Sequence, residues 1–307
     1  MSGLFKGFKQ RPRDLRVQAR QLEANTMLLA GLHVDRVRKM GVVPSLRDVE
    51  FKVYSQGGED GILQYLLTHI PIENRSFIEF GVETYIEANT RFLIMHDDWK
   101  GLIIDGGTEN IQEIQADKTV YAKHDLTAIC SFITRDNVNQ LFTSAGFSGD
   151  IGILSIDIDG NDYWIWEAIQ SVSPRIVICE YNSVFGPEAT ITIPYDPSFD
   201  RGKAHYSYLY FGASLAALCN LADKKGYDFV GSNTMGNNAF FVRKDLHHPI
   251  RKLTALDGHV VSTHRMDSRD IHGNLSRIGG SKRLEMIKDM PVVNIQTGTT
   301  GPISNFV

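Results

Sequence analysis

The feature that most constrains the fold is a regular alternation of apolar runs and helical patterns between residues 76 and 183. Apolar runs occupy 76–81, 100–107, 118–126, 151–160 and 174–183. Segments with helical spacing follow the first four of them, at 87–99, 108–117, 135–147 and 161–172. Continuous apolar strands separated by helices form a parallel sheet that is covered on both faces. We therefore expect a doubly wound, Rossmann-like α/β fold.

The pattern changes after the fifth predicted strand. A loop at 183–211 leads to a helical segment at 213–227, and two strand patterns at 227–231 and 238–244 then flank the turn-rich string "SNTMGN". Such an arrangement is typical of a β-hairpin. The predicted sheet thus has seven strands, is mostly parallel and ends in an antiparallel hairpin. We expect this domain at 51–250, a helical arm at 1–50 and a C-terminal extension at 251–307.

The N-terminal arm differs from the rest of the chain in composition. Residues 1–41 contain nine Lys or Arg residues and three acidic ones, and their leucines are spaced for one or two helices. Two interpretations stay open. In the first, the arm packs on the body or on a second subunit of a homo-oligomer. In the second, the "GLFKGF" stretch and the basic residues make peripheral contact with an anionic membrane surface.

Composition restricts the class of protein. The net charge of −4 argues against a chain that binds nucleic acid through its overall charge. Cys130, Cys179 and Cys219 are far apart and show no CxxC spacing, which predicts buried thiols in a reducing compartment. The sequence has no apolar run of the roughly 18 residues needed to span a bilayer and no signal-peptide pattern at its start. We expect a cytoplasmic protein.

Four strings carry a resemblance to a known family. They are "YSQGGEDGIL" (54–63), "FIEFGVETYIEANT" (77–90), "GLIID" (101–105) and "LSIDIDGNDYWIWEAI" (154–169). In this order and spacing, the chain resembles class I S-adenosylmethionine-dependent methyltransferases of the FkbM type over about residues 54–244. The resemblance implies O-methylation of a hydroxyl group on a sugar or glycosylated product. It implies S-adenosylmethionine as cofactor, with Mg²⁺ as a further candidate, and a sugar or glycosylated small molecule or polysaccharide as acceptor.

The same resemblance assigns cofactor-binding residues. Glu79 and Gly81 match the first methyltransferase motif, in which a glycine lets the backbone approach the methionine part of the cofactor. The loop then reads "GVETY" where further glycines are usual, and Glu83 is placed to receive the amino group of the cofactor. Asp105 stands at the position that binds the ribose hydroxyls. Asp125, in "KHDL", is expected to contact the adenine amino group.

Acidic residues at the ends of the fourth and fifth strands are the candidate chemical centre. Asp157, Asp159 and Glu180, together with Asn182, offer the oxygen ligands that Mg²⁺ prefers. Methyl transfer to a hydroxyl needs the proton removed as the oxygen attacks, which a cation or a base assists. A metal site, a carboxylate base without metal (Asp157), and a hydrated structural turn are the three interpretations. Asp162 is expected to cap the helix that follows.

The loop before the 213–227 helix offers a second candidate base. His205 lies in "RGKAHYSYLYFG", a string rich in aromatic and basic residues that could close over a sugar. In "YSQGGEDGIL", Gln56 and Glu59 either border the pocket or belong to a capped helix start.

Two other functions fit parts of the pattern. The D-x-D of Asp157 and Asp159 also occurs in glycosyltransferases that hold a sugar nucleotide through a metal ion. The irregular glycine loop is compatible with a non-catalytic Rossmann-like domain that binds a nucleotide. The run of acids after the strands favours the methyltransferase.

Overall fold

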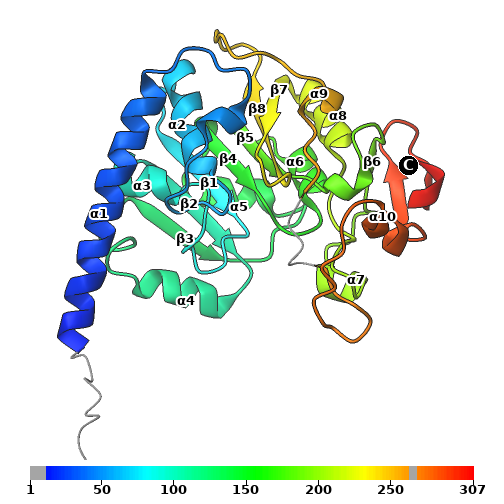
Figure 1. Ribbon diagram of the computed structural model, residues 1–307, viewed down its shortest axis with the longest axis horizontal. Helices are drawn as coiled ribbons and strands as arrows, with labels where there is room; N and C mark the ends of the chain where they lie inside the picture. The colour runs from blue at the N-terminus through cyan, green and yellow to red at the C-terminus, as the bar shows by residue number, and fades with distance from the viewer. Residues whose placement is uncertain (1–11, 263–267) are drawn as a thin grey trace, which may run out of the picture.

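The computed structural model describes residues 12–262 and 268–307, and its centre is one twisted sheet (Figure 1). The sheet has seven strands in the order β3-β2-β1-β4-β5-β8-β7. The five strands β1 to β5 are mutually parallel, and β8 runs antiparallel to both β5 and β7. This confirms the predicted mostly parallel sheet that ends in a hairpin. The strands are β1 (Ser76–Phe80), β2 (Lys100–Asp105), β3 (Leu126–Cys130), β4 (Gly149–Ile156), β5 (Val172–Glu180), β7 (Tyr227–Ser232) and β8 (Asn238–Arg243).

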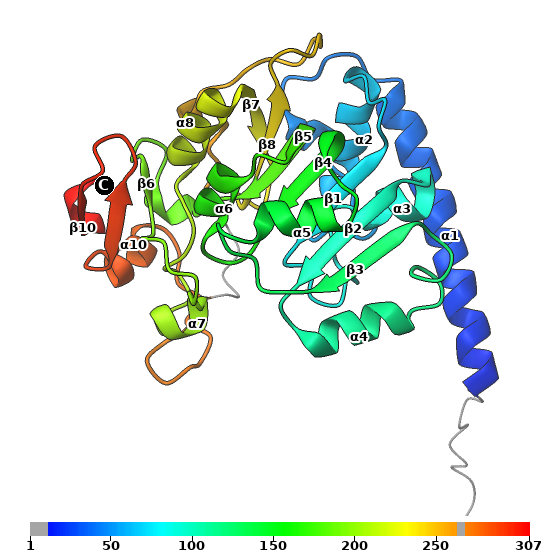
Figure 2. The same ribbon diagram turned by 180° about the vertical axis from the view of Figure 1, so that it is seen from behind.

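Helices cover both faces of the sheet, as expected for a doubly wound fold. Apolar side chains of α1 to α4 form one cluster with alternate residues of the strands, and those of α5, α6 and α8 form another on the opposite face. Figure 2 shows α5 and α6 in front of the sheet. Burial of these two apolar surfaces drives the layers together. The helices are α1 (Pro12–Arg38), α2 (Glu59–His69), α3 (Arg91–Asp97), α4 (Thr108–Ala116), α5 (Val138–Ser144), α6 (Asp162–Ala168) and α8 (Leu215–Lys225).

The third strand is not where the sequence pattern predicted it. Residues 118–124 form turns after α4, and β3 begins only at Leu126. β3 is the edge strand of the sheet and pairs with β2 alone. Its side chains are only partly buried, so its sequence lacks the continuous apolar run of the central strands. The prediction of a strand at 118–126 was therefore wrong.

The C-terminal extension forms a small lobe together with the loop that follows β5. A three-stranded antiparallel sheet joins β6 (Ile191–Thr192), β9 (Pro291–Asn294) and β10 (Thr300–Pro302). The lobe has its own apolar cluster, which includes Phe185, Leu209 and Ile303. Its short helices are η2 (Ser183–Phe185), α7 (Arg201–Ala204), α10 (Ser281–Ile287) and η3 (Ile303–Asn305). Two further short helices belong to the main body, namely η1 (Leu46–Val49) and α9 (Ala255–Gly258).

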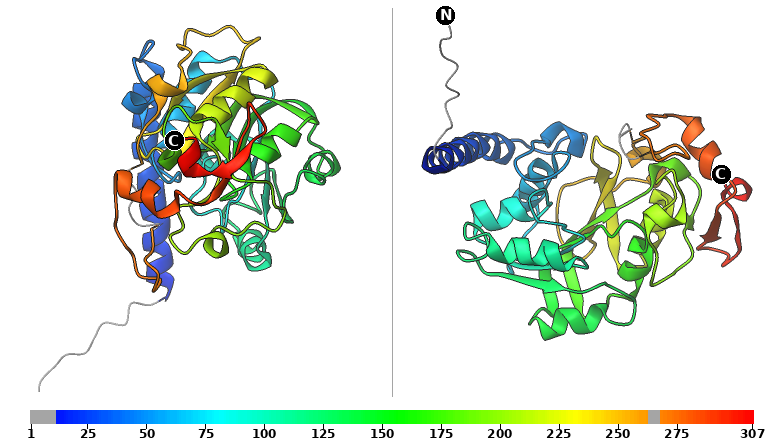
Figure 3. Two further views of the ribbon diagram at one scale, coloured as in Figure 1. Left: turned by 90° about the vertical axis from the view of Figure 1, so that its right-hand side faces the viewer. Right: turned by 90° about the horizontal axis from the view of Figure 1, so that it is seen from below.

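Helix α1 lies at the opposite end of the molecule from this lobe, and its N-terminal part extends beyond the body (Figures 1 and 3). Ala30, Val34 and Val37 on its inner face are buried in the main core. The opposite face carries leucines that are 60–71% exposed, namely Leu22, Leu28, Leu29 and Leu32. The "GLFKGF" stretch lies outside the described residues. Among the described residues, no helix combines the length and apolar character required to cross a membrane.

Candidate active site

A cavity of about 570 Å³ opens at the carboxyl ends of the parallel strands. Its lining includes Gly81 after β1, Asp105 at the end of β2, Asp157 after β4 and Glu180 at the end of β5. β1 and β4 are neighbours, and the chain leaves them in opposite directions across the sheet. The cavity therefore lies at the topological switch point, where open α/β sheets bind their ligands.

Gly81 brings three strand ends together. Its backbone has φ +75°, a conformation that favours glycine. A Cβ at this position would lie 1.6 Å from the carbonyl oxygen of Asp157. The Gly81 N–H also donates to the carbonyl oxygen of Ile104 at 3.1 Å. The predicted glycine thus forms a tight cradle of backbone at the floor of the cavity.

Glu79 is buried beside this cradle, and its carboxylate is engaged within the protein. It accepts hydrogen bonds from the backbone N–H of Asn89 at 2.9 Å, from the backbone N–H and hydroxyl of Thr90, and from the hydroxyl of Ser155. Burial raises the pKa of Glu79. The bonds fix the loop from β1 to α3, and Asn89 of that loop lines the cavity. Glu79 acts on the cavity mainly by shaping its wall.

Asp105 organises the adjoining wall. Its carboxylate accepts hydrogen bonds from the backbone N–H of Glu83 at 2.8 Å, from that of Gly107 at 2.7 Å, and from Nδ2 of Asn110 at 2.9 Å. A carboxylate offers about four acceptor sites, so room remains for about one further donor. Glu83 has a left-handed backbone with φ +47°, and its side chain is exposed at the cavity.

Asp125 does not lie at the site. β3 begins at Leu126, so Asp125 precedes the strand, and its carbonyl oxygen accepts from the N–H of Gly101 at the start of β2. It is therefore at the amino end of the sheet, and the expected adenine contact was wrong. Ser131, Phe132 and Ile133 follow β3 at the carboxyl end and line the cavity instead. The sequence analysis missed these three residues because it placed the third strand at 118–126, before the true β3. The Phe132 side chain is 78% exposed.

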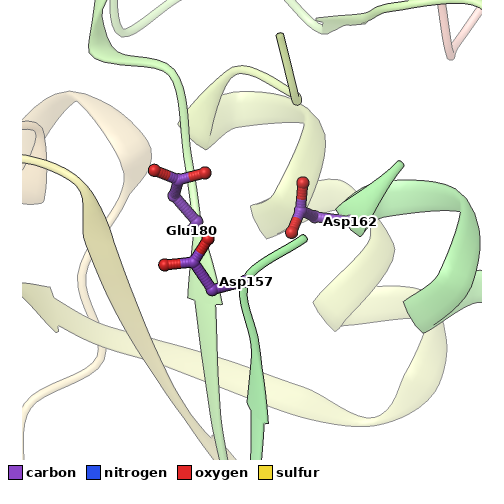
Figure 4. Close-up of side chains that lie close together, drawn as sticks. All are labelled: Asp157, Asp162 and Glu180. Carbon is purple, nitrogen blue, oxygen red and sulfur yellow. The ribbon is translucent and has the colours of Figure 1, made fainter. Parts of the chain in front are cut away.

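Three carboxyl groups converge between β4 and β5. Asp157, Asp162 and Glu180 can each offer one oxygen such that the three lie within 4.8 Å of one another (Figure 4). Burial, followed by the neighbouring acids Asp159 and Asp162, raises the pKa of Asp157 well above its usual range. Burial and the charge of Asp157 do the same to the pKa of Glu180. Burial raises the pKa of Asp162 to about 6. The cluster therefore favours a bound cation or shared protons.

The composition of this cluster differs in part from the predicted set. Asp157 and Glu180 converge as expected, and Asp162 completes the group. Asp162 also accepts from the backbone N–H groups of Ile158 and Gly160, at 2.9 and 3.0 Å. Asp159 has φ +56°, which turns its exposed side chain into an ion pair with Arg201.

Asn182, the predicted neutral ligand, is used to hold the chain after β5. Its Nδ2 donates to the carbonyl oxygens of Leu209 and Phe211 at 2.8 and 3.0 Å. Its Oδ1 accepts from the N–H of Val184 at 3.0 Å. Asn182 lines the cavity, but these bonds give it the role of an anchor between β5 and the loop before α8.

His205 does not line the cavity. Its Nδ1 lies 2.7 Å from the hydroxyl of Ser207, and its ring is tilted against Tyr206 at a centroid distance of 4.4 Å. Burial lowers the pKa of His205. Within the described residues, the same loop presents Arg201 to the cavity, and α10 presents Arg283. Neither arginine was singled out from the sequence.

No protein-family model and no curated protein sequence matches this chain. Solved structures are similar to this chain only at a low level. PKMT2 from Rickettsia typhi in complex with AdoHcy has a TM-score of 0.39 and 9% identity over 60% of this chain and 52% of that one. The N-terminal domain of EvdMO1, with SAH and D-fucose, has a TM-score of 0.38 and 11% identity, over 80% of this chain and 100% of that one. The match thus spans about half the length of PKMT2.

Proposed function

We propose that this protein is an S-adenosylmethionine-dependent O-methyltransferase that acts on a hydroxyl of a sugar or glycosylated product. The observation that carries the proposal is the layout of one cavity. A glycine cradle and Asp105 stand at its β1–β2 side, and an acidic cluster stands at its β4–β5 side. A mostly parallel sheet that ends in an antiparallel hairpin is also what the sequence resemblance leads us to expect.

The residues present fit the cofactor. A side chain at Gly81 would fill the cradle, and Asp105 keeps an acceptor site for a ribose hydroxyl. Glu83 supplies a carboxylate for an amino group, and Phe132 supplies an exposed ring for a base. When bound, S-adenosylmethionine would supply a methyl group attached to a sulfonium ion.

The acidic cluster would prepare the accepting hydroxyl. Asp157 would take the proton from the hydroxyl, which the raised pKa of this carboxyl favours. Asp157, Asp162 and Glu180 would hold a divalent cation, if one takes part, and a cation lowers the pKa of a bound hydroxyl. Glu180 gives evidence in favour of a bound cation, because its Oε2 is buried and has no hydrogen-bond partner among the described residues. A buried carboxylate oxygen without a donor is costly unless a ligand satisfies it.

The small lobe would bind the acceptor. It closes the β5 side of the cavity with a mixture of aromatic, apolar and polar side chains, which suits a sugar ring with its apolar faces and hydroxyl edges. The lining from this side includes Ser183, Val184, Pro197, Phe199, Arg201, Leu209 and Phe211.

Two alternatives have less support. In a metal-dependent glycosyltransferase, the D-x-D pair would be expected to hold the metal, whereas Asp159 pairs with Arg201 and leaves the cluster to Asp157, Asp162 and Glu180. A non-catalytic nucleotide-binding domain would account for the glycine cradle and Asp105. It would not account for the buried acidic cluster.

Replacement of Asp157 by Asn tests the proposal. The change keeps the shape of the side chain and removes its charge, so methyl transfer from labelled S-adenosylmethionine to a panel of sugars should fall by orders of magnitude. Calorimetry should show that S-adenosylhomocysteine still binds. Asp136→Asn is the matched control, because Asp136 is exposed and outside the cavity lining.

Chelation separates the two mechanisms. If EDTA removes activity and Mg²⁺ restores it, the cluster acts through a cation, and if EDTA has no effect, Asp157 acts as the base. Normal turnover by the Asn variant would show that the cluster is a hydrated turn. Binding of NAD or a sugar nucleotide in place of S-adenosylhomocysteine would support the alternatives.

A further inference from the structure

Asn238 faces the acidic cluster from a strand that the sequence did not connect with it. In the antiparallel pairing of β5 with β8, Asn238 is directly opposite Glu180. Residues directly opposite in a sheet project to the same face with Cβ atoms about 4.5–5.5 Å apart. Both residues line the cavity, and both are more than nine-tenths buried.

Glu59 fixes which way the Asn238 amide points. The Nδ2 of Asn238 donates to Oε1 of Glu59 at 2.9 Å, and Nδ2 of Asn233 donates to the same oxygen at 2.6 Å. Glu59 is fully buried at the start of α2, and its Oε2 accepts from the N–H of Gly57 at 2.8 Å. A carboxylate can only accept, so the amide nitrogen of Asn238 must face Glu59. Its oxygen therefore faces away from Glu59.

Two acceptor atoms are left unsatisfied by this arrangement. Oδ1 of Asn238 and Oε2 of Glu180 are both buried, and neither has a hydrogen-bond partner among the described residues. A buried acceptor without a hydrogen-bond donor is costly. Two of them on a directly opposed pair, beside Asp157 and Asp162, would be satisfied together by one bound cation.

We propose that Asn238 Oδ1 is the neutral ligand of a divalent cation held by Asp157, Asp162 and Glu180, and that Glu59 is the positioning residue that aims it. The inference deepens the proposed function, because it assigns a ligand at the same centre. Three carboxylates and one amide oxygen are a ligand set that Mg²⁺ and Mn²⁺ accept. A hydrogen bond that orients a ligand commonly contributes 10–100-fold to metal affinity. Asn238 thus takes the part that the sequence pattern gave to Asn182.

Direct titration with Mn²⁺, followed by electron paramagnetic resonance, tests the proposal without methyl transfer. The full-length protein should bind one Mn²⁺ with competition by Mg²⁺. Asn238→Ala should weaken binding at least tenfold, since it removes a ligand. Glu59→Ala should weaken it about 10–100-fold, since it removes the oxygen that accepts from the Asn238 amide and the amide is no longer held. Asn305→Ala, an exposed amide in η3, is the matched control and should bind as the unmodified protein does.

A second measurement uses the unmodified protein and does not depend on the folding of a variant. In nuclear magnetic resonance spectra, saturation with Mg²⁺ should shift the Asn238 side-chain amide signals and leave those of Asn305 in place. Unaltered Asn238 signals, or Mn²⁺ binding by Asn238→Ala equal to that of the unmodified protein, would overturn the proposal. Failure of S-adenosylhomocysteine to bind would overturn the proposed methyltransferase function alone, because the Mn²⁺ titration is read separately.

Discussion

At the scale of single residues, the carboxylate of Asp105 both builds the cavity wall and remains open to a ligand. Three donors from the protein hold it at the end of β2. This pre-organisation would lower the cost of ordering the group in the proposed contact with a ribose. A variant of Asp105 is therefore best compared with a variant of Asn110, which helps to build the cavity wall but is not expected to bind the ligand.

Asp105→Ala should reduce the affinity for S-adenosylhomocysteine by about 1–3 kcal/mol, through the loss of hydroxyl contacts. Asn110→Ala is the control, because it removes one hydrogen bond to Asp105 and leaves the carboxylate, so affinity should change by less than about 1 kcal/mol. Isothermal calorimetry measures both. Equal losses in the two variants would mean that Asp105 only supports the wall.

Asp60 should make the stability of the protein depend on pH. Its Oδ2 accepts from the backbone N–H groups of Val53, Tyr54 and Ser55, yet burial raises the pKa of Asp60 to about 6. Because this folded-state pKa lies above the usual 3.8, the native state holds the proton more tightly than the unfolded state. The free energy of unfolding should therefore fall as pH rises from about 4 to about 6, by up to about 3 kcal/mol from this group.

Asp60→Asn should remove that part of the slope. Urea unfolding between pH 4.5 and 7 measures it, with the exposed Asp136→Asn as control. Other buried carboxyls add slopes of their own, so the comparison is the difference between variant and unmodified protein. An identical slope in the two would show that Asp60 does not titrate in this range.

At the scale of elements, the contact between the ends of β1 and β4 sets the shape of the site. Gly81→Ala would place a Cβ against the Asp157 carbonyl oxygen in a left-handed backbone. We expect unfolding free energy to fall by more than about 3 kcal/mol, and S-adenosylhomocysteine binding to be lost in the protein that still folds. Thermal unfolding and calorimetry are the measurements.

Gly146→Ala is the matched control for Gly81→Ala. Gly146 has φ +82°, but no atom lies within 4 Å of its added Cβ, so only the backbone strain of about 1–2 kcal/mol applies. The excess loss in Gly81→Ala is the cost of forcing the strand ends apart. Similar losses in both variants would mean that β1 and β4 can separate without damage to the site.

At the scale of the whole molecule, α1 has two apolar faces, of which the body covers one. Val34 on the inner face is 1% exposed, so Val34→Ala should cost about 2–3 kcal/mol of stability. Leu29 on the outer face is 60% exposed, so Leu29→Ser should cost less than about 0.5 kcal/mol. Leu22, Leu29 and Leu32 follow coiled-coil spacing, and we expect this face to pair with a second copy of the chain. Light scattering should then show a lower mass for Leu29→Ser combined with Leu32→Ser.

An unchanged mass in the double variant would contradict pairing through α1. Sedimentation with anionic vesicles, lost in the same variant, would instead favour the membrane interpretation of the arm. Urea unfolding of Val34→Ala and Leu29→Ser is independent of the light-scattering and vesicle results, because it measures only which face of α1 is buried against the body.

The local pattern of the sequence was sufficient for the layers of the fold. Central strands are buried on both faces, so they must be continuous apolar runs, and β1, β2, β4 and β5 were found where those runs lie. β3 was placed wrongly because an edge strand is partly exposed and does not need a continuous apolar run. Parallel strands also place their carboxyl ends together, so Asp105, Asp157 and Glu180 were expected near one another, while Gly81 was assigned through the family resemblance.

Only the tertiary structure decided how the side chains at those ends are used. A left-handed residue at Asp159 turns one carboxylate out to Arg201 and lets Asp162 take its place. Asn182 is committed to carbonyl oxygens of the loop before α8. Glu59 aims Asn238 across a separation of 179 residues. The period of a sequence reports which face of an element is buried, but a hydrogen bond between distant elements depends on where the folded chain brings them, and no local pattern contains that information.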